Sequence, residues 1–465
     1  MIRMTLDEIA AITGGRLVNA DPAAVVTGPV EYDNRALLPG GLFVAFAGEK
    51  VDGHDFAGAA VEAGAVGVLG TRDTGRPGIV VEDPLRALAA LASVVVSRLP
   101  ELTIVGLTGS SGKTTTKDYI GQLLGRLGET VAPAGSLNNE LGFPYTVLKA
   151  TTATRFLVLE MGARGIGHIR YLTDMAGPRI GVVLNVGAAH IGEFGSVEGT
   201  ARAKGELVEA LSEDGVAVLN ADDPLVAAMA ARTSARVVRV GEAPEASVRA
   251  VDVTLDERGR AAYTLVTPAG SAPVRLAVTG RHQVGNTLAA AAVALEAGMA
   301  PAAVAAALGE VGIVSGRRMD VFDRADGVTV IDDSYNANPS STAAALHALA
   351  ALGQGRRTVA VLGYMAELGE HDAAGHQEVG RLAAELGVGR LIAVAGNAAP
   401  ILDGAATVPA WKGEAVLAAD QAEAVAALRG DLRPGDVVLV KGSRYRTWEV
   451  ADALRADAAG EEVGP

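Results

Sequence analysis

The chain contains no cysteine among its 465 residues. This absence excludes disulfides, thiolate metal ligands and cysteine nucleophiles, and it is compatible with a reducing compartment. The chain is also poor in positive charge, with 40 Lys and Arg residues against 54 Asp and Glu residues and a formal net charge of −14. Because proteins that bind nucleic acid neutralise its phosphates with basic surfaces, this balance argues against nucleic acid as a partner.

Long apolar stretches are missing as well. No apolar run of about 18 residues is free of charged residues, so we expect no membrane span. The N-terminal sequence, MIRMTLDE, lacks the apolar core of a signal peptide, and we therefore expect a cytoplasmic protein. With 49% hydrophobic and 20% charged residues, the chain has the composition of a globular protein. Its length predicts two or three domains.

Apolar runs alternate with helical stretches along most of the chain. In the first hundred residues, short strands such as 42–46 and 79–81 precede an alanine-rich helix over 84–98, which predicts a small α/β domain. From residue 102 onward the apolar runs end in polar or glycine turns. This alternation predicts parallel strands with crossover helices and with ligands at the carboxyl ends of the strands. The runs are 102–107, 156–159, 180–184 and 216–219.

Two later segments differ from this alternation. Residues 250–278 form short alternating strands around turns, which predicts a hairpin appendage, and residues 286–297 predict a long helix. A second alternating series begins near Val328 and predicts a third domain. Its expected strands are 328–331, 359–362, 391–394 and 437–440. We therefore expect domains over residues 1–99, 100–314 and 315–465.

The clearest functional signal is the sequence GLTGSSGKTTTK over residues 106–117. An apolar strand leads directly into a glycine-rich turn, in which consecutive backbone N–H groups can converge on phosphate oxygens. Lys113 can then reach the outer phosphates, and the Thr114 hydroxyl can hold Mg²⁺. The spacing is the short form G-x-x-G-K-T, since Leu107 stands where the longer motif has glycine. This motif predicts a nucleoside triphosphate ligand. The alternative, a chance turn of small residues, is less favoured because a strand precedes the turn and a helix follows it.

Polar residues also end other predicted strands of the middle segment. Glu160 ends one strand and His190 follows another, so both could face the phosphate loop. Mg²⁺ prefers oxygen ligands, which suits Glu160 better than His190. An ordinary salt bridge remains the alternative for Glu160. From its residue type alone, His190 is better explained as a hydrogen-bonded core histidine.

Three further segments are polar but ambiguous. On composition alone, Lys204 in a predicted helix is a solvated surface lysine, and Asn138 and Asn139 belong to a loop that can be a simple turn. Residues 332–338 follow the first strand of the third domain, so their polar groups should lie at a ligand-facing edge. Capping of the next helix by Asn338 is the alternative, and both roles can hold at once.

Short motifs recur in order along the whole chain, at residues 33–35, 42–45, 52–56, 108–115, 137–140, 159–163, 189–190, 194–196, 203–206, 220–224 and 333–339. Together they resemble the Mur ligase family, the ATP-dependent amide-forming enzymes of peptidoglycan assembly. The string Tyr-Asn-Ala-Asn-Pro at 335–339 resembles the branch that adds D-alanyl-D-alanine rather than the first three amino acids.

The resemblance implies a fold and a reaction. The implied fold has an N-terminal α/β domain for the UDP end of the precursor, a central P-loop-type ATPase domain with a parallel sheet, and a C-terminal Rossmann-like domain that closes over the nucleotide. The implied reaction joins UDP-MurNAc-tripeptide and D-alanyl-D-alanine through an acyl phosphate, with ATP and Mg²⁺, and we expect a monomer. A paralogue that forms another amide bond is the alternative, whereas the intact motifs disfavour a non-catalytic nucleotide-binding scaffold.

The resemblance also assigns residues. In several family members the lysine that matches Lys204 is carbamylated, which turns a cation into a carboxylate-like Mg²⁺ ligand and overrides the surface-lysine interpretation. The implied catalytic residues are Lys113, Glu160, His190 and Lys204, and the implied metal ligands are Thr114, Glu160, His190 and carbamylated Lys204. The implied ATP site comprises Thr108, Gly109, Ser110, Ser111, Gly112, Lys113, Thr114, Thr115, Asn286 at adenine, Arg318, and Asp333 at ribose. The implied substrate site comprises Asn34, Arg35, Asn138, Asn139, Tyr335, Asn336 and Asn338.

Four features depart from the family pattern. Asn34 replaces the serine of an Asp-Ser-Arg motif, and Gln283 stands where asparagine is usual, which leaves Asn286 as the firmer adenine contact. Tyr364 replaces a common aspartate, and residues 445–448 give the last motif an aromatic ending. All four lie outside the phosphate loop, on elements expected to face substrates, which keeps the paralogue alternative open.

Overall fold

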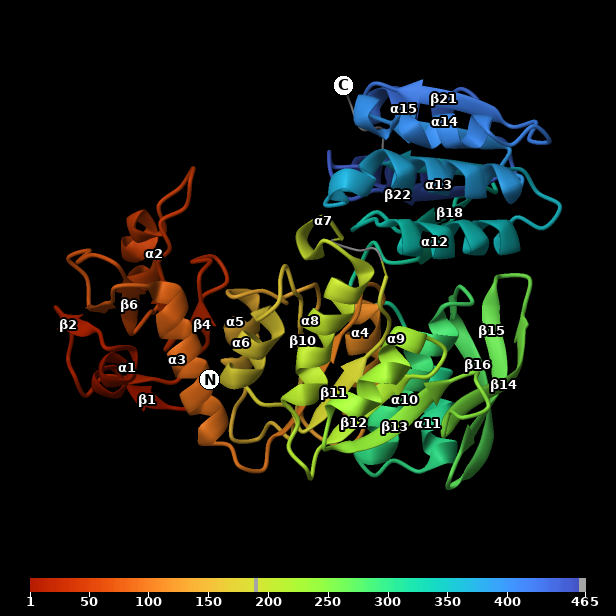
Figure 1. Cartoon of the computed structure of the whole chain (residues 1–465). Helices are drawn as coiled ribbons and strands as arrows, with labels where there is room; N and C mark the ends of the chain where they lie inside the picture. The colour runs from red at the N-terminus through yellow and green to blue at the C-terminus, as the bar shows by residue number, and fades with distance from the viewer. Residues whose placement is uncertain (188–190, 460–465) are drawn as a thin grey trace.

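The computed structural model describes residues 1–187 and 191–459, which form three α/β units that follow one another along the chain (Figure 1). The N-terminal unit has a two-stranded and a five-stranded sheet, the central unit a nine-stranded sheet and the C-terminal unit a six-stranded sheet. The predicted three-domain α/β fold is therefore confirmed. Among the described residues, no helix has the length and apolar character needed to cross a membrane.

The N-terminal unit consists of β1 (Met4–Thr5), α1 (Leu6–Thr13), β2 (Arg16–Val18), β3 (Val25–Val26), β4 (Val30–Glu31), β5 (Leu42–Val44), η1 (Gly53–Phe56), α2 (Ala57–Glu62), β6 (Gly67–Gly70), β7 (Gly78–Val80) and α3 (Pro84–Ser97). Helix α3 begins where predicted because Asp83 accepts the Leu85 backbone N–H at 2.8 Å and Pro84 takes the first helical position. Its buried face shares a core with Phe143 and Val147, so the unit is packed against the centre of the molecule.

The central unit consists of β8 (Thr103–Thr108), α4 (Lys113–Leu124), β9 (Thr130–Val131), α5 (Gly142–Val147), β10 (Phe156–Glu160), α6 (His168–Met175), β11 (Ile180–Val183), α7 (Ile191–Phe194), α8 (Val197–Glu209), β12 (Val216–Asn220), α9 (Pro224–Ala227), η2 (Ala228–Arg232), β13 (Arg236–Gly241), β14 (Val248–Leu255), β15 (Arg260–Thr267), β16 (Gly270–Thr279), α10 (Gln283–Glu296) and α11 (Pro301–Leu308). The sheet order is β16-β15-β14-β13-β12-β11-β8-β10-β9. Strands β8 to β14 pair in parallel, as the alternation of apolar runs and helices predicted.

The expected hairpin appendage is wrong in one respect. Strand β15 is antiparallel to both of its neighbours, β14 and β16, as expected of a hairpin, but the three strands continue the central sheet instead of standing apart from it. The reason is that β14 pairs in parallel with β13, through Val240 with Val248 and Gly241 with Arg249. Backbone groups at the edge of β13 are thereby satisfied by the hairpin.

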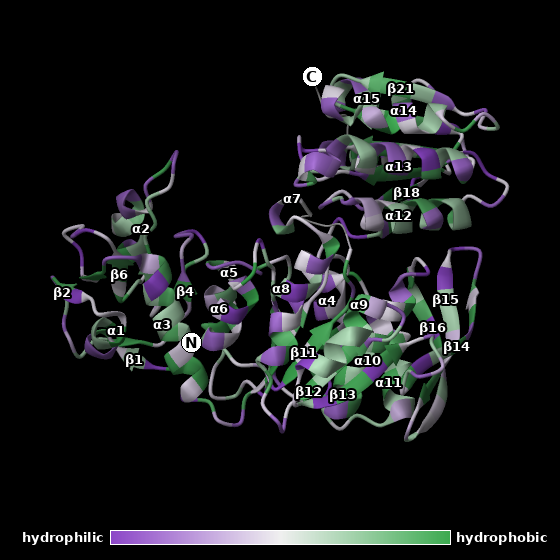
Figure 2. Ribbon diagram, viewed as in Figure 1, coloured by the Kyte–Doolittle hydropathy of each residue, from purple (hydrophilic) through white to green (hydrophobic). Residues whose placement is uncertain are grey.

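Helices α4 and α10 pack against each other beside this sheet. The long helix predicted over 286–297 is α10, whose alanine residues 289–292 are buried. Because alanine is small, the helix can approach its neighbours closely and still leave no cavity. Figure 2 shows the resulting apolar interior of strands β11 to β13 and helix α10.

The C-terminal unit consists of β17 (Asp320–Asp323), β18 (Thr329–Asp332), α12 (Pro339–Leu352), β19 (Thr358–Gly363), η3 (Gly369–His371), α13 (Asp372–Glu385), β20 (Arg390–Val394), η4 (Gly396–Ala398), α14 (Pro400–Ala406), β21 (Glu414–Ala418), α15 (Gln421–Arg429), β22 (Val437–Lys441) and α16 (Trp448–Ala459). Its sheet order is β17-β18-β22-β19-β20-β21, parallel except for β17. Strand β22, the last strand of the chain, lies between β18 and β19. The order of the strands in the sheet therefore departs from their order in the chain at this point. Open α/β sheets bind ligands beside such a point.

The connection between the central and C-terminal units is anchored to helix α4. Gln122 of α4 binds both the backbone N–H and the carbonyl of Gly312, at 2.9 and 3.0 Å, and Asp118 accepts the Ser315 N–H at 3.0 Å. Beyond these anchors, Arg317 and Met319 have φ values of 61° and 54°. The turn toward the C-terminal unit therefore begins immediately after a segment fixed to the phosphate-loop helix.

Candidate active site

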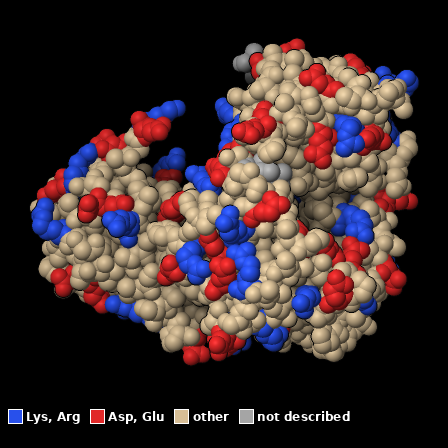
Figure 3. Space-filling model, viewed as in Figure 1, with Lys and Arg blue, Asp and Glu red and all other residues tan. Residues whose placement is uncertain are grey.

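A cavity of about 380 Å³ lies between the central and C-terminal units. Its walls come from the loop before α4, the ends of β10 and β11, one side of α10, the segment before β17, the segment after β18 and the end of β22. In Figure 3 the surface is open in a deep notch between the N-terminal and C-terminal units. The cavity therefore joins the carboxyl ends of strands from two parallel sheets, the position at which such sheets bind ligands.

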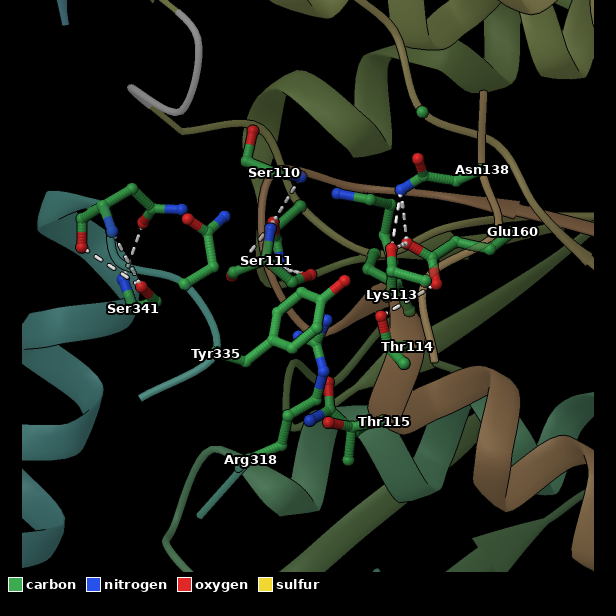
Figure 4. Close-up of a pocket in the computed structure, with 18 of the residues that line it drawn as sticks. Ser110, Ser111, Lys113, Thr114, Thr115, Asn138, Glu160, Arg318, Tyr335 and Ser341 are labelled. Atoms are coloured by element: carbon green, nitrogen blue, oxygen red, sulfur yellow. Dashed lines mark hydrogen bonds between the residues drawn. The ribbon is translucent and has the colours of Figure 1, made fainter. Parts of the chain in front are cut away.

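The glycine-rich loop occupies the centre of the cavity (Figure 4). The backbone N–H groups of Ser110 and Ser111 converge on the side-chain oxygen of Asn185, at 3.0 and 2.9 Å. Gly112 has φ +77°, and a Cβ added there would lie 2.6 Å from the Asn286 Oδ1 atom. Glycine is thus required at position 112 both for its backbone conformation and for its contact with α10. A loop whose amides already share one oxygen has the geometry of an anion site.

Glu160 accepts hydrogen bonds from the polar groups on the other side of the loop. Its buried carboxylate accepts the Thr114 hydroxyl at 2.8 Å on one oxygen. The other oxygen accepts Ser136 at 2.8 Å and Asn138 Nδ2 at 2.7 Å. Among the described residues, Glu160 is therefore held by hydrogen bonds from three neutral groups rather than by a salt bridge.

Two lysines face this carboxylate region. Lys113 Nζ donates to the Gly109 carbonyl at 2.8 Å, and burial lowers its pKa, with Glu160 opposing and Arg318 adding to the change. Lys204 on α8 is only 3% exposed, and burial together with the charge of Lys113 lowers its pKa well below the usual range. Within the described part of the chain, no residue accepts a hydrogen bond from Lys204 Nζ. Lys204 is therefore a buried amine that favours the neutral form.

The C-terminal unit contributes a second group of polar residues. Asp333 accepts the Met319 backbone N–H at 3.1 Å and pairs with Lys441, whose Nζ also donates to the Asn336 carbonyl at 3.0 Å. The Arg318 guanidinium stacks on the Tyr335 ring, 4.1 Å from its centroid, and both side chains face the phosphate loop (Figure 4). A planar cation and an anchored carboxylate thus face the loop from the opposite unit.

Known proteins resemble this chain along its length. UDP-N-acetylmuramoyl-tripeptide–D-alanyl-D-alanine ligase of Mycobacterium bovis is 49% identical, with 100% of both chains covered. The chain belongs to the Mur ligase family. The enzyme of the same name from Escherichia coli is 38% identical over 83% of this chain and 85% of its own length.

Domain models and solved structures agree with the assignment to the Mur ligases. The Mur ligase family catalytic domain matches residues 29–95, the middle domain matches 107–294 and the glutamate ligase domain matches 317–444. MurF from Acinetobacter baumannii has a TM-score of 0.85 and 32% identity, covering 97% of this chain and 99% of its own. MurF from Thermotoga maritima in complex with ADP has a TM-score of 0.79 and 28% identity, covering 94% and 99%. The domain order found in this Mur ligase is therefore that of MurF.

Most residues predicted for ATP line the cavity. These are Ser110, Ser111, Gly112, Lys113, Thr114, Thr115, Asn286, Arg318 and Asp333. Thr108 does not, because its buried hydroxyl donates to the Met161 carbonyl at 2.9 Å behind the loop. Gly109 contributes its carbonyl to Lys113 rather than a surface to the cavity.

The residues predicted for the other substrates fall into two groups. Asn138, Asn139, Tyr335, Asn336 and Asn338 line the same cavity. Asn34 and Arg35 lie in the N-terminal unit and do not line it, and Arg35 makes a two-point pair with Asp33 at 2.9 and 2.7 Å. His190 lies outside the described residues.

Sequence reasoning missed several residues of the site. Asn185, which holds the loop amides, lies two residues after the end of β11, and Lys441, which pairs with Asp333, ends β22. The rule that ligands gather at the carboxyl ends of parallel strands could have identified both. No sequence signal identified Ser136, because its role depends on how its loop folds toward Glu160.

The donors available for Mg²⁺ are oxygens. Among the described residues, no group of three acidic, histidine or cysteine side chains comes together for a metal ion. Thr114 and Glu160 are nevertheless adjacent at 2.8 Å, and Lys204 lines the same cavity. Mg²⁺ prefers oxygen ligands and usually keeps waters and substrate phosphates, so a small protein donor set suits it. These residues therefore fit the ion, and a carbamate on Lys204 would add one more oxygen group.

Asn338 provides a stability prediction. Its side chain accepts the Ser341 N–H at 2.9 Å, and Ser341 donates its hydroxyl to the Asn338 carbonyl and accepts the Asn338 N–H, which closes a capping box at the start of α12. We expect Asn338→Ala to lower the free energy of unfolding by about 1 kcal/mol, measured in urea or by heat. Asn338→Ser, which preserves a capping oxygen, is the control. Equal losses in both variants would contradict the capping role.

Proposed function

We propose that this Mur ligase joins D-alanyl-D-alanine to UDP-N-acetylmuramoyl-tripeptide, with conversion of ATP to ADP and phosphate. The observation that carries the proposal is 49% identity over the full length of a protein with that name, combined with a complete phosphate loop facing Asp333 and Arg318. We also propose that the domains span 1–99, 100–314 and 315–465. The residues assigned to catalysis all belong to one chain, and we propose a monomer.

The first step makes the peptide carboxylate reactive. A carboxylate cannot expel oxide near neutral pH, so its oxygen attacks the γ-phosphorus of ATP, ADP leaves, and an acyl phosphate forms. Lys113 and the amides of the loop at 109–114 hold the phosphates and balance the charge that grows on their oxygens. Thr114, Glu160 and modified Lys204, together with His190 outside the described residues, would hold Mg²⁺, which would supply Lewis-acid charge neutralisation at the phosphates.

The second step forms the amide bond. The free amine of D-alanyl-D-alanine attacks the acyl carbonyl, and the tetrahedral intermediate collapses with loss of phosphate and a proton. We assign Asp333 to the ATP ribose and Arg318 with Tyr335 to the nucleotide, on the C-terminal wall of the cavity. That wall also shields the acyl phosphate from water, because the unit that carries it closes against the loop.

One assay tests the proposal directly. Phosphate release is measured with UDP-MurNAc-tripeptide alone, D-alanyl-D-alanine alone, both together, or neither. We expect rapid release only when both are present, because the acyl phosphate forms only on the peptide carboxylate and is consumed only by the amine. ATP turnover that depends on other acids and amines instead would contradict the proposal and identify a paralogue.

A further inference from the structure

Four residues outside the cavity form a closed ring of polar contacts. Lys117 Nζ donates to the Gly135 carbonyl at 2.8 Å, and the Gly135 N–H donates to the Ser315 hydroxyl oxygen at 2.8 Å. The Ser315 N–H donates to Asp118 at 3.0 Å, and an ion pair between Asp118 and Lys117 at 3.0 Å closes the ring. Lys117, Asp118 and Ser315 are each at most 5% exposed. Because a satisfied buried network is rigid, the ring fixes the segments that carry it relative to one another.

Two members of the ring belong to the phosphate-loop helix α4. This helix begins at Lys113, and its second residue is Thr114, whose hydroxyl donates to Glu160 at 2.8 Å (Figure 4). Lys117 and Asp118 follow one turn further along the same helix. The ring is therefore built on the element that carries one of the oxygen donors available for Mg²⁺.

Gly135 connects the ring to the second donor. The next residue, Ser136, lines the cavity, donates its hydroxyl to Glu160 at 2.8 Å and accepts Asn138 Nδ2 at 2.9 Å. Gly135 has φ +83°, a conformation that glycine adopts readily, and its N–H is bound by Ser315. The direction in which Ser136 reaches the Glu160 carboxylate is therefore set by a hydrogen bond made one residue earlier.

Ser315 itself belongs to the connection that leads to the C-terminal unit. Three residues later, Arg318 lines the cavity and faces the phosphate loop (Figure 4). The Met319 N–H then donates to Asp333 at 3.1 Å. Ser315 is therefore the point at which the C-terminal wall of the cavity is tied to the loop of Gly135.

We propose that Ser315 is a positioning residue for the Mg²⁺ site. It acts through Gly135 and Ser136 on the carboxylate of Glu160. The inference rests on the proposed function, which assigns Thr114 and Glu160 to the ion. Tight binding of Mg²⁺ requires a near-octahedral set of oxygens, so a small rotation of one carboxylate weakens it. The ring holds the loop of Ser136 at a fixed distance from α4 and thereby keeps the two donors in register.

The test measures how much Mg²⁺ strengthens the binding of AMP-PNP, an ATP analogue that the enzyme cannot cleave between its β- and γ-phosphates. The Kd is determined by calorimetry on the full chain in excess Mg²⁺ and in excess EDTA. The ratio of the EDTA value to the Mg²⁺ value reports the part of binding that depends on the metal. We expect Ser315→Ala to lower this ratio about tenfold, as losing a group that only orients a metal ligand does, with the value in EDTA unchanged.

Two further variants separate this role from a purely structural one. Ser136→Ala should also lower the ratio, and the double variant with Ser315→Ala should match Ser136→Ala alone, because Ser315 acts through Ser136. Gln122→Ala is the matched control and should leave the ratio unchanged. The Gln122 side chain holds the same connection, at Gly312, and also binds the Asp118 carbonyl, but it does not bind the loop of Gly135.

Several outcomes would overturn the inference. A wild-type ratio in Ser315→Ala is one, and an equal weakening of binding in Mg²⁺ and in EDTA is another, because it would indicate a distorted nucleotide pocket. An equal loss in Gln122→Ala would show that the connection acts as a whole. Losses that add in the double variant would show that Ser315 acts by a route other than Ser136.

The same measurement separates this inference from the proposed function. Affinity of the wild type for AMP-PNP that does not respond to Mg²⁺ would contradict the assignment of Thr114 and Glu160 to the ion. No UDP-peptide or dipeptide is present, so the result does not depend on which acid and amine the enzyme joins.

Discussion

Lys113→Ala is expected to lower kcat for phosphate release by about a hundredfold to a thousandfold, the usual effect of removing one donor that stabilises transition-state charge. Lys113 Nζ lies at the mouth of the loop, bound at 2.8 Å to Gly109, and its buried position strengthens its interaction with phosphate oxygens. The measurement is single-turnover formation of ADP with the UDP-peptide present. Multiple-turnover rates alone would not separate chemistry from product release.

The matched control for Lys113 is Lys117, one turn further along α4. Lys117 is buried too, but its Nζ binds the carbonyls of Pro133 and Gly135 and pairs with Asp118 at 3.0 Å, away from the cavity. Lys117→Met is therefore expected to reduce stability more than the chemical step in the molecules that fold. A Lys113→Ala enzyme that forms ADP at the wild-type rate would contradict the assignment of Lys113 to the phosphates.

The strands and their carboxyl-end residues were predictable because both follow from local patterns. Buried parallel strands are continuous apolar runs, and β8, β10 and β22 all begin within a residue or so of the predicted position. The phosphate loop was predictable for the same reason, since glycine and lysine at fixed spacing determine it. Glu160 was placed correctly at a strand end, but its three hydrogen-bond donors come from different loops.

The residues that sequence reasoning misjudged depend on long-range packing. Composition made Lys204 a surface residue, yet α8 turns it inward, and only family resemblance indicated otherwise. Glu140 belongs to the recognised motif at 137–140, whereas Arg164, which lines the same cavity, gave no signal, because the contact between Gly162 and Asn138 is what brings their two loops together. The hairpin β14 to β16 was mistaken for an appendage because parallel pairing with β13 leaves no mark in the sequence. Tertiary contacts therefore decide where the charged side chains point.

Lys204→Ala is expected to lower activity at least about a hundredfold. Loss of a group that only supports a metal ligand typically costs about tenfold to a hundredfold, and a direct ligand should cost more. The physical basis is the state of the amine. Burial and the charge of Lys113 lower its pKa well below the usual range, which favours the neutral, nucleophilic form of the amine. A neutral amine adds CO₂ and loses a proton to give a carbamate. The carbamate oxygens would then face Lys113 and join Thr114 and Glu160 as oxygen donors for Mg²⁺.

The carbamate itself is testable apart from activity. Enzyme equilibrated with ¹³C-labelled bicarbonate should show a carbamate carbon resonance that disappears in Lys204→Ala and in Lys204→Arg, since a guanidinium stays protonated. Removing bicarbonate should weaken the wild type and leave the residual activity of both variants unchanged. Lys117 supplies an internal comparison, because that buried lysine is paired with Asp118 and lies outside the cavity. A labelled resonance that survives in Lys204→Ala, or full activity of that variant, would refute the modified lysine and leave Thr114 and Glu160 as the described protein donors for the ion.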